Sequence, residues 1–222
     1  MLRPSSRPYV DRAEAGAVLA ERLVAQPAVP AGDLLVLGLP RGGIPVAGPV
    51  ASRLQAPLDV LLVRKVGLPG QPELAMGAVA AIGNRTVAVA NDTVLRQRGV
   101  PAAEFRAACD DELIILYQQA IRYRGDRTPL ELPGRPVIVV DDGLATGATM
   151  RAAVAVLRAA GAGHLTVAVP IGAPRSCQEL AGQVEALVCP WQPADFRSVS
   201  QGYRDFSQTS EATVIDILAT SK

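Results

Sequence analysis

The stretch that decides the fold is Val137-Ile-Val-Val-Asp-Asp-Gly-Leu-Ala-Thr-Gly-Ala-Thr-Met150. Its first four residues are all apolar, which predicts a strand buried on both faces, as strands of parallel sheets are. Two carboxylates and a glycine-containing turn follow, and then a helical periodicity that ends at Gly161. A buried strand that leads through a polar loop into a helix is typical of α/β proteins, whose ligands lie at the carboxyl ends of the strands.

Outward from this stretch, short apolar runs alternate with helical patterns along the chain. We expect strands at 34–39, 59–64, 86–90, 137–140, 165–169 and 184–188. We expect helices at 13–24, 44–54, 102–123, 149–160, 174–182 and 211–219. This alternation predicts an α/β fold with a doubly wound, mostly parallel sheet. We interpret residues 1–222 as one domain, with its core at about 13–190 and a tail at about 191–222.

Composition limits the classes of function. The 222 residues, of which 49% are hydrophobic, are enough for one generous α/β core or at most two small ones. The net charge of +1 gives no overall field that attracts nucleic acid or an anionic membrane, so any anion site must be local. Neither the segment Met1 to Asp11 nor the uncharged stretch Ala159 to Pro174 reads as a signal peptide or a membrane span. We therefore expect a cytoplasmic protein.

The cysteines and the histidine do not form a metal-binding pattern. Cys109, Cys177 and Cys189 are widely spaced and His164 is the only histidine, which favours a reduced cytosolic protein. Cys109 and Cys189 fit small buried hydrophobic residues better than nucleophiles. His164 precedes a strand and has no obvious partner, so we interpret it as a surface or core histidine.

The loop after the strand at 137–140 carries groups that suit an anion. Backbone N–H groups from Ala145 to Thr149, and the hydroxyls of Thr146 and Thr149, would face an anion at the start of a helix. Asp141 and Asp142 would repel a phosphate unless sugar hydroxyls or a hydrated Mg²⁺ lie between them. A ribose 5-phosphate meets both demands. An ordinary Asp-Gly turn that caps a helix is the alternative.

The segment Asp141 to Thr149 resembles the signature by which type I phosphoribosyltransferases bind 5-phosphoribosyl-1-pyrophosphate (PRPP). The resemblance implies a fold of that type, with a small hood made from the C-terminal and N-terminal parts. It implies that Asp141 and Asp142 hold the ribose and, through water, Mg²⁺. It also implies that the 5′-phosphate is bound by Ala145, Thr146, Gly147, Ala148 and Thr149.

Two further segments are similar to the same family. Gly38-Leu-Pro-Arg-Gly-Gly43 resembles its pyrophosphate loop, which implies contacts to the diphosphate from Pro40, Arg41, Gly42 and Gly43. Val63-Arg-Lys-Val-Gly-Leu-Pro-Gly70 is similar to a stretch of adenine phosphoribosyltransferases, and this implies that Arg64 and Lys65 also bind the diphosphate. A plain glycine turn and a solvated strand edge are the respective alternatives.

The chain departs from the family where acceptors are selected. Ala145 stands where the enzymes for 6-oxopurines carry an aspartate, which disfavours hypoxanthine and guanine. The catalytic loop of the adenine enzymes is not recognisable at 71–79, where Glu73 is the only carboxylate and fits a salt bridge as well as catalysis. The C-terminal aromatic residues Trp191, Phe196 and Tyr203 either stack on the acceptor base or anchor the tail to the core.

The resemblance extends to stand-alone bacterial proteins over nearly the whole chain. It implies transfer of the 5-phosphoribosyl group from PRPP to a nitrogenous base, with release of pyrophosphate. Asp141, Asp142 and Arg41 are the catalytic candidates, Mg²⁺ is the cofactor, and a homodimer is expected. A PRPP-sensing module without transferase activity is the alternative, and a phosphate-site hydrolase or transferase on a related sheet is a third. The sequence lacks G-x-x-x-x-G-K-[ST] and G-x-G-x-x-G, which argues against nucleoside-triphosphate and dinucleotide enzymes.

Overall fold

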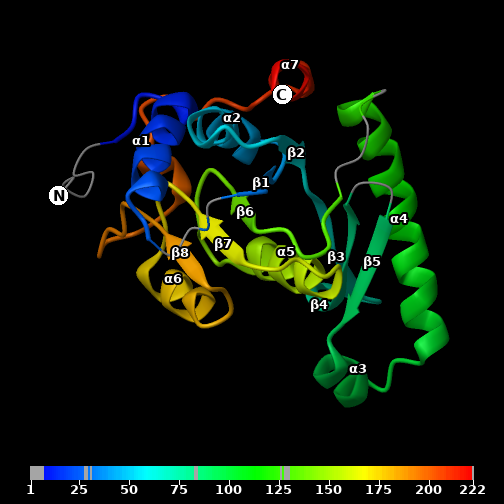
Figure 1. The fold of residues 1–222 in the computed structure, drawn as a ribbon. Helices are drawn as coiled ribbons and strands as arrows, with labels where there is room; N and C mark the ends of the chain where they lie inside the picture. Colours follow the sequence, from blue (N-terminus) through cyan, green and yellow to red (C-terminus); the bar gives the residue numbers. More distant parts are fainter. Residues whose placement is uncertain are drawn as a thin grey trace.

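A parallel sheet of five short strands forms the centre of the protein (Figure 1). The computed structural model describes residues 8–27, 30, 32–82, 85–125, 127 and 131–221. Across the sheet the strands are β2 (Leu58–Val60), β1 (Leu35–Gly38), β6 (Val137–Val140), β7 (Leu165–Ala168) and β8 (Ala186–Val188). This is a doubly wound order, and its direction reverses between β1 and β6. The predicted α/β fold with a mostly parallel sheet is confirmed.

Helices cover both faces of this sheet, which explains why its strands are apolar at successive positions. Val36 and Ile138 face one core, beside α1 (Arg12–Val24), α2 (Gly43–Leu54) and α7 (Glu211–Thr220). Leu37 and Val139 face the other core, beside α5 (Ala148–Ala159) and α6 (Pro174–Ala181). Figure 1 shows the two helical layers on opposite sides of the strands. These helices begin and end within one residue of the predicted limits.

A second, antiparallel sheet stands beside the first. Its strands are β3 (Leu62–Leu68), β4 (Gln71–Ile82) and β5 (Arg85–Ala90), and the long helix α4 (Ala102–Arg124) packs against it. Figure 1 shows α4 running along this sheet, with the short helix α3 (Asp92–Arg98) at one end. The predicted strand at 59–64 is in fact β2 and the start of β3, which lie in different sheets and are separated only by Leu61.

The sequence prediction was incomplete in this second sheet. The strand at 86–90 was expected in the parallel sheet, but β5 is antiparallel to β4. Strand β4 and helix α3 were not predicted. Strand β4 is rich in alanine and has only two β-branched residues, Val79 and Ile82, so its strand signal is weak. Its small residues admit α4 closely: a Cβ added at Gly77 would lie 2.6 Å from the Phe105 ring.

A buried ion pair fastens α4 to the parallel sheet. Arg124 Nε lies 3.2 Å from Asp59 Oδ1, and the side chains are 7% and 6% exposed. Arg124 Nη2 also donates to the Val60 carbonyl at 3.1 Å. Because Asp59 and Val60 belong to β2, these contacts fix α4 relative to the end of the parallel sheet.

The C-terminal tail returns to the start of the described chain. After the short 3₁₀ helix η1 (Val199–Gly202), the Arg204 N–H donates to the Tyr9 carbonyl at 2.8 Å. Tyr9 and Tyr203 pair in an isolated parallel bridge, and their rings are 5.8 Å apart.

None of the helices in the described ranges combines the length and the apolar composition needed to cross a bilayer.

Candidate functional site

The loops after β1 and β6 leave the same edge of the sheet from neighbouring strands. The pairing of β1 with β6 extends one residue beyond β1, because the Leu39 N–H donates a hydrogen bond to the Val140 carbonyl at 2.9 Å. The glycine loop and the acidic pair therefore meet where the strand order reverses, which is where open α/β sheets bind ligands.

Glycines allow these two loops to touch. A Cβ added at Gly42 would lie 2.1 Å from Asp142 Oδ2, and one added at Gly43 would lie 2.7 Å from the Val140 carbonyl oxygen and 2.9 Å from Asp141 Cα. No side chain fits at these distances, so the contact requires glycine at both positions. The Pro40–Arg41 peptide bond in the same loop is cis. Two segments that lie about a hundred residues apart in the sequence thus form one surface.

The acidic pair is held by hydrogen bonds from both ends of the chain. Asp141 Oδ1 accepts from the Asp142 N–H at 2.8 Å, and Asp142 Oδ2 accepts from Arg12 Nε at 2.9 Å. The Tyr203 hydroxyl donates to the Asp142 carbonyl at 2.5 Å. Arg12 is fixed in turn by the Ser207 carbonyl at 2.7 Å and by the Phe206 ring, whose centroid is 4.1 Å from Arg12 Cζ.

Burial controls the charge of these two carboxyl groups. Burial raises the pKa of Asp141 well above its usual value, and the neighbouring Asp142 charge raises it further. Burial also raises the pKa of Asp142, although the hydrogen bond and the charge of Arg12 oppose this shift. A ligand that brings hydroxyl donors or a cation to this pair would therefore stabilise the ionised forms.

The loop that follows the acidic pair presents unpaired backbone N–H groups. Gly147 adopts a left-handed conformation with φ of +71° and caps α5. The loop carbonyls point back into the protein: Ser176 Oγ donates to the Ala145 carbonyl at 2.6 Å, and Arg151 Nη1 donates to the Thr146 carbonyl at 2.9 Å. The N–H groups of Ala145, Thr146 and Gly147 donate to no acceptor within the described part of the chain. Free N–H groups at a helix N-terminus suit an anion.

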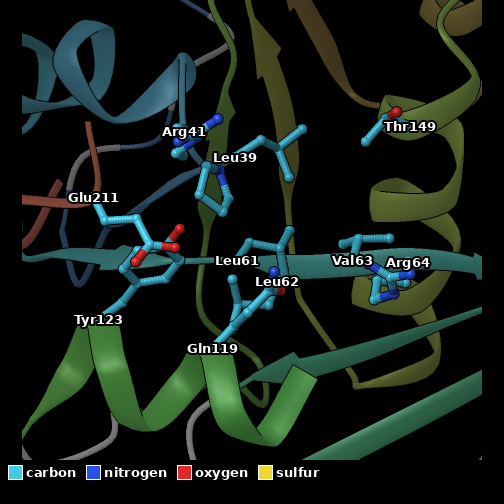
Figure 2. Close-up of a pocket in the computed structure, with 11 residues that line it drawn as sticks. Leu39, Arg41, Leu61, Leu62, Val63, Arg64, Gln119, Tyr123, Thr149 and Glu211 are labelled. Atoms are coloured by element: carbon cyan, nitrogen blue, oxygen red, sulfur yellow. The ribbon is translucent and has the colours of Figure 1, made fainter. Parts of the chain in front are cut away.

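A cavity of about 440 Å³ opens beside these loops (Figure 2). Its lining includes four residues proposed from the sequence: Pro40, Arg41, Arg64 and Thr149. Arg41 is exposed, and its guanidinium has no ion-pair partner among the described residues. Arg64 enters from β3 and forms an ion pair with Glu112 of α4. The cavity is therefore lined by two arginines, one from the glycine loop after β1 and one from β3.

Other side chains of this cavity were missed by sequence reasoning. Gln119 and Tyr123 come from α4 and Glu211 starts α7, and Figure 2 shows Glu211 beside the Tyr123 ring. Arg12, the partner of Asp142, was missed as well. These residues carry no local motif, so a single sequence gave no signal for them. They reach the site only because α1, α4 and α7 pack around the sheet.

Lys65 does not accompany Arg64 into the cavity, contrary to what the basic pair implies. Successive side chains of a strand point to opposite faces. Lys65 accordingly lines a different groove, of about 530 Å³, together with Ala148 and Arg151 of α5. Glu73, the other sequence candidate in this sheet, lies in β4, and its side chain is outside the described residues.

The C-terminal aromatic residues pack mainly on each other. Tyr9, Ala15, Ile171 and Tyr203 form a small buried cluster, against which Trp191 and Phe196 pack. Tyr203 is only 7% exposed, so little of its ring is available to a ligand. The arrangement matches the anchoring alternative for Tyr203, while Trp191 and Phe196 stay half-buried.

A bound Mg²⁺ would depend on oxygens from a ligand. No group of three or more His, Cys, Asp or Glu side chains gathers in the described ranges to hold a metal. Asp141 and Asp142 fit the usual role of one or two carboxylates that complete the shell of a substrate-bound Mg²⁺. Burial raises the pKa of both carboxyl groups, and the charge of Asp142 raises that of Asp141 further, so a nearby cation would favour their ionised forms.

Comparison with known proteins agrees with this geometry. The family model described as phosphoribosyl transferase domain matches residues 11–183. Two curated proteins from Mycobacterium tuberculosis strains, Rv0571c and MT0597, carry provisional phosphoribosyl transferase names and are each 50% identical over 210 residues. The match includes 95% of this chain and 46% of each relative, so the chain spans about half of their length. The crystal structure of TT1426 from Thermus thermophilus superposes with a TM-score of 0.83 at 38% identity, covering 95% of this chain and 97% of that one.

Proposed function

The chain belongs to the phosphoribosyl transferase domain family, and on this premise we propose that it transfers the 5-phosphoribosyl group of PRPP to a small nitrogenous base and releases pyrophosphate. One observation carries the proposal: the glycine loop after β1 touches the acidic pair after β6. The loop at 145–147, whose backbone N–H groups have no acceptor in the described structure, follows the acidic pair, and Arg41 and Arg64 line the neighbouring cavity. PRPP has a phosphate, a ribose and a diphosphate in the matching order.

In this proposal the 5′-phosphate binds at the start of α5. The N–H groups of Ala145, Thr146 and Gly147 donate to its oxygens, joined by Ala148 and by the hydroxyl of Thr149. Gly147 supplies the left-handed turn that aligns these groups. The macrodipole of α5 adds a favourable interaction of about 0.3–1 kcal/mol with an anion.

Asp141 and Asp142 accept hydrogen bonds from the ribose hydroxyls. As pyrophosphate departs from the anomeric carbon, positive charge develops on the ribose ring, and the two carboxylates stabilise it because they are already in place. Arg12 orients Asp142 through its bond to Oδ2. The backbone of Asp142 is fixed by Tyr203, so the carboxylate needs little rearrangement when the ligand binds.

The diphosphate lies against Pro40, Arg41, Gly42 and Gly43, with Arg64 facing it from β3. Arg41 and Arg64 neutralise charge that grows on the leaving group. Mg²⁺, held by the substrate oxygens with Asp141 and Asp142 through water, would supply further charge neutralisation. Lys65 is left out of this arrangement because its side chain lines the other groove.

We also propose a homodimer in a reducing, cytosolic setting, without nucleic acid or membrane partners. The helix α4 supports the dimer: Ile114, Tyr117 and Ile121 share one face by their spacing and are 57%, 51% and 72% exposed. All three cysteines are free, in line with a reducing compartment.

The decisive experiment offers PRPP, Mg²⁺ and a panel of nucleobases to the protein and measures pyrophosphate release. We expect calorimetry to show PRPP binding in the presence of Mg²⁺ that is tighter than binding of ATP or NAD. Removal of Mg²⁺ with a chelator should weaken PRPP binding more than ribose 5-phosphate binding, because only PRPP has a diphosphate. PRPP binding without pyrophosphate release for any acceptor would favour a sensing module. Absence of PRPP binding would contradict the proposed phosphoribosyl transfer.

The variant Asp142→Asn tests the acidic pair. The amide keeps the shape of the side chain but removes the charge that faces Arg12 and the ribose. We expect ribose 5-phosphate affinity to fall by roughly tenfold or more, in line with about 1.5–3 kcal/mol for hydrogen bonds to charged groups. Circular dichroism should show a folded chain. Asp205→Asn, at a fully exposed position of the C-terminal tail, is the control and should bind normally. Normal binding of ribose 5-phosphate by Asp142→Asn would show that the acidic pair has a structural role and does not bind the ligand.

A further inference from the structure

Two of the three cysteines face each other beneath the candidate phosphate loop. Cys177 lies in α6 and Cys189 directly follows β8. A Cβ added at Gly172 would lie 2.6 Å from Cys177 Sγ and 3.2 Å from Cys189 Sγ. Both sulfurs therefore converge on the same glycine, and the absence of a side chain there leaves the space between them open. The mechanism proposed above uses neither thiol.

The segment that carries Cys177 also carries the anchors of the phosphate loop. Ser176, the residue before Cys177, donates to the Ala145 carbonyl at 2.6 Å. The Leu144 N–H donates to the Ile171 carbonyl at 2.9 Å, and the Ala173 N–H donates to the Leu144 carbonyl at 2.8 Å. A shift of α6 toward β8 would thus be transmitted directly to the loop at 144–147.

The two thiols differ in pKa and in exposure. Cys177 is only 2% exposed but forms part of the lining of a surface groove of about 420 Å³, and Cys189 is half-buried. A hydrogen bond from Cys189 lowers the pKa of Cys177, while the same contact and burial raise the pKa of Cys189. Cys177 is therefore the thiol that ionises first, and the thiolate is the form that reacts with peroxides.

We propose that Cys177 and Cys189 form a disulfide on exposure to hydrogen peroxide and that this bond loosens the phosphate loop. The Cys177 thiolate attacks one peroxide oxygen, the O–O bond breaks, and the departing hydroxide takes a proton to leave as water. Cys189 sulfur then displaces the hydroxyl of the resulting sulfenic acid, which leaves as a second water with the thiol proton. One peroxide is reduced and two thiols are oxidised. A thiol reductant reverses the bond.

The consequence for ligand binding follows from geometry and rests on the proposed function. A disulfide needs its sulfurs about 2.05 Å apart, much closer than two thiols in contact, and we expect its formation to draw α6 toward the end of β8. The Ser176 bond to Ala145 is then lengthened or lost. We expect PRPP affinity to fall by roughly tenfold, as for the loss of one buried hydrogen bond.

The test uses the full chain, reduced or treated with hydrogen peroxide, then denatured and alkylated with iodoacetamide. Reduced protein should take up three labels, and oxidised protein one label, on Cys109. Cys177→Ser and Cys189→Ser should each prevent the disulfide, whereas Cys109→Ser should leave it intact. Three labels after oxidation of the wild type, or a disulfide that includes Cys109, would overturn the proposal.

Hydrogen exchange of the amides at 144–149 reports on the loop without any ligand. Faster exchange is expected in the oxidised wild type and in oxidised Cys109→Ser, but not in oxidised Cys177→Ser. A disulfide that leaves both this exchange and PRPP affinity unchanged would contradict the link to the loop. If the disulfide and faster exchange are found but reduced protein does not bind PRPP, the proposed function fails and the redox site stands.

Discussion

Arg41→Ala should weaken PRPP binding by about 30-fold to several thousand-fold while ribose 5-phosphate affinity changes little. Truncation of one charged partner in a bound pair typically costs about 2–5 kcal/mol, and each 1.4 kcal/mol is about tenfold in affinity. Arg41 lines the cavity beside the glycine loop and has no ion-pair partner in the described ranges, so its charge is available to a ligand. Only PRPP presents a diphosphate to it.

Calorimetry with both ligands, at fixed salt and Mg²⁺, measures this difference. Arg53→Ala is a matched control, because Arg53 is exposed on α2, the helix that follows the glycine loop, and pairs with Glu21 away from the cavity. Both variants should unfold at nearly the same temperature as the wild type. Equal losses for PRPP and ribose 5-phosphate would mean that Arg41 supports the fold or the 5′-phosphate, and the diphosphate assignment of 38–43 would then be abandoned.

The parts of the site that could be predicted are those encoded within one short segment. The loop from Asp141 to Thr149 and the loop from Gly38 to Gly43 combine a strand end, turn residues and a helix start, and each pattern is local. Their contact could be anticipated as well, since carboxyl ends of adjacent parallel strands share an edge. The need for glycine at 42 and 43 becomes visible only in the structure, where the loops touch.

The parts that could not be predicted depend on packing between distant elements. Arg12 lies 130 residues before Asp142, and its side chain reaches the carboxylate because α1 begins beside the C-terminal tail. Nothing in the sequence distinguishes Tyr123 from other positions of its long helix, and it lines the cavity only because α4 packs against the second sheet. The alanines of β4 weaken its strand signal for the same reason that they suit α4: small side chains allow close packing.

Asp142 illustrates how tertiary contacts change a sequence-based expectation. A ligand-facing carboxylate was expected, and the structure gives this carboxylate a protein partner, Arg12, with side chains 12% and 16% exposed. Asp142→Asn therefore also removes an ion pair, and some loss of stability should accompany the loss of binding. The phosphate loop differs, because the N–H groups of Ala145, Thr146 and Gly147 have no acceptor in the described part of the chain.

Arg124→Ala should lower the free energy of unfolding by about 3–5 kcal/mol, the typical cost of leaving one charge of a buried pair without its partner. Arg124 and Asp59 are 7% and 6% exposed, and Arg124 also holds the Val60 carbonyl. The variant leaves the Asp59 carboxylate buried where water cannot replace the guanidinium. Urea denaturation measures the loss. PRPP affinity of the folded fraction should change little, because Arg124 does not line the cavity.

Two further variants separate this ion pair from a general effect of shortening α4 side chains. Arg122→Ala removes an exposed pair with Glu211 on the same helix and should cost about 0–1 kcal/mol. The double variant Asp59→Leu with Arg124→Met replaces the buried pair by apolar side chains of similar volume, which is often neutral or stabilising. We expect it to recover most of the stability lost in Arg124→Ala. A double variant as unstable as Arg124→Ala would show that α4 is fastened through the Val60 carbonyl rather than through the charge of Asp59.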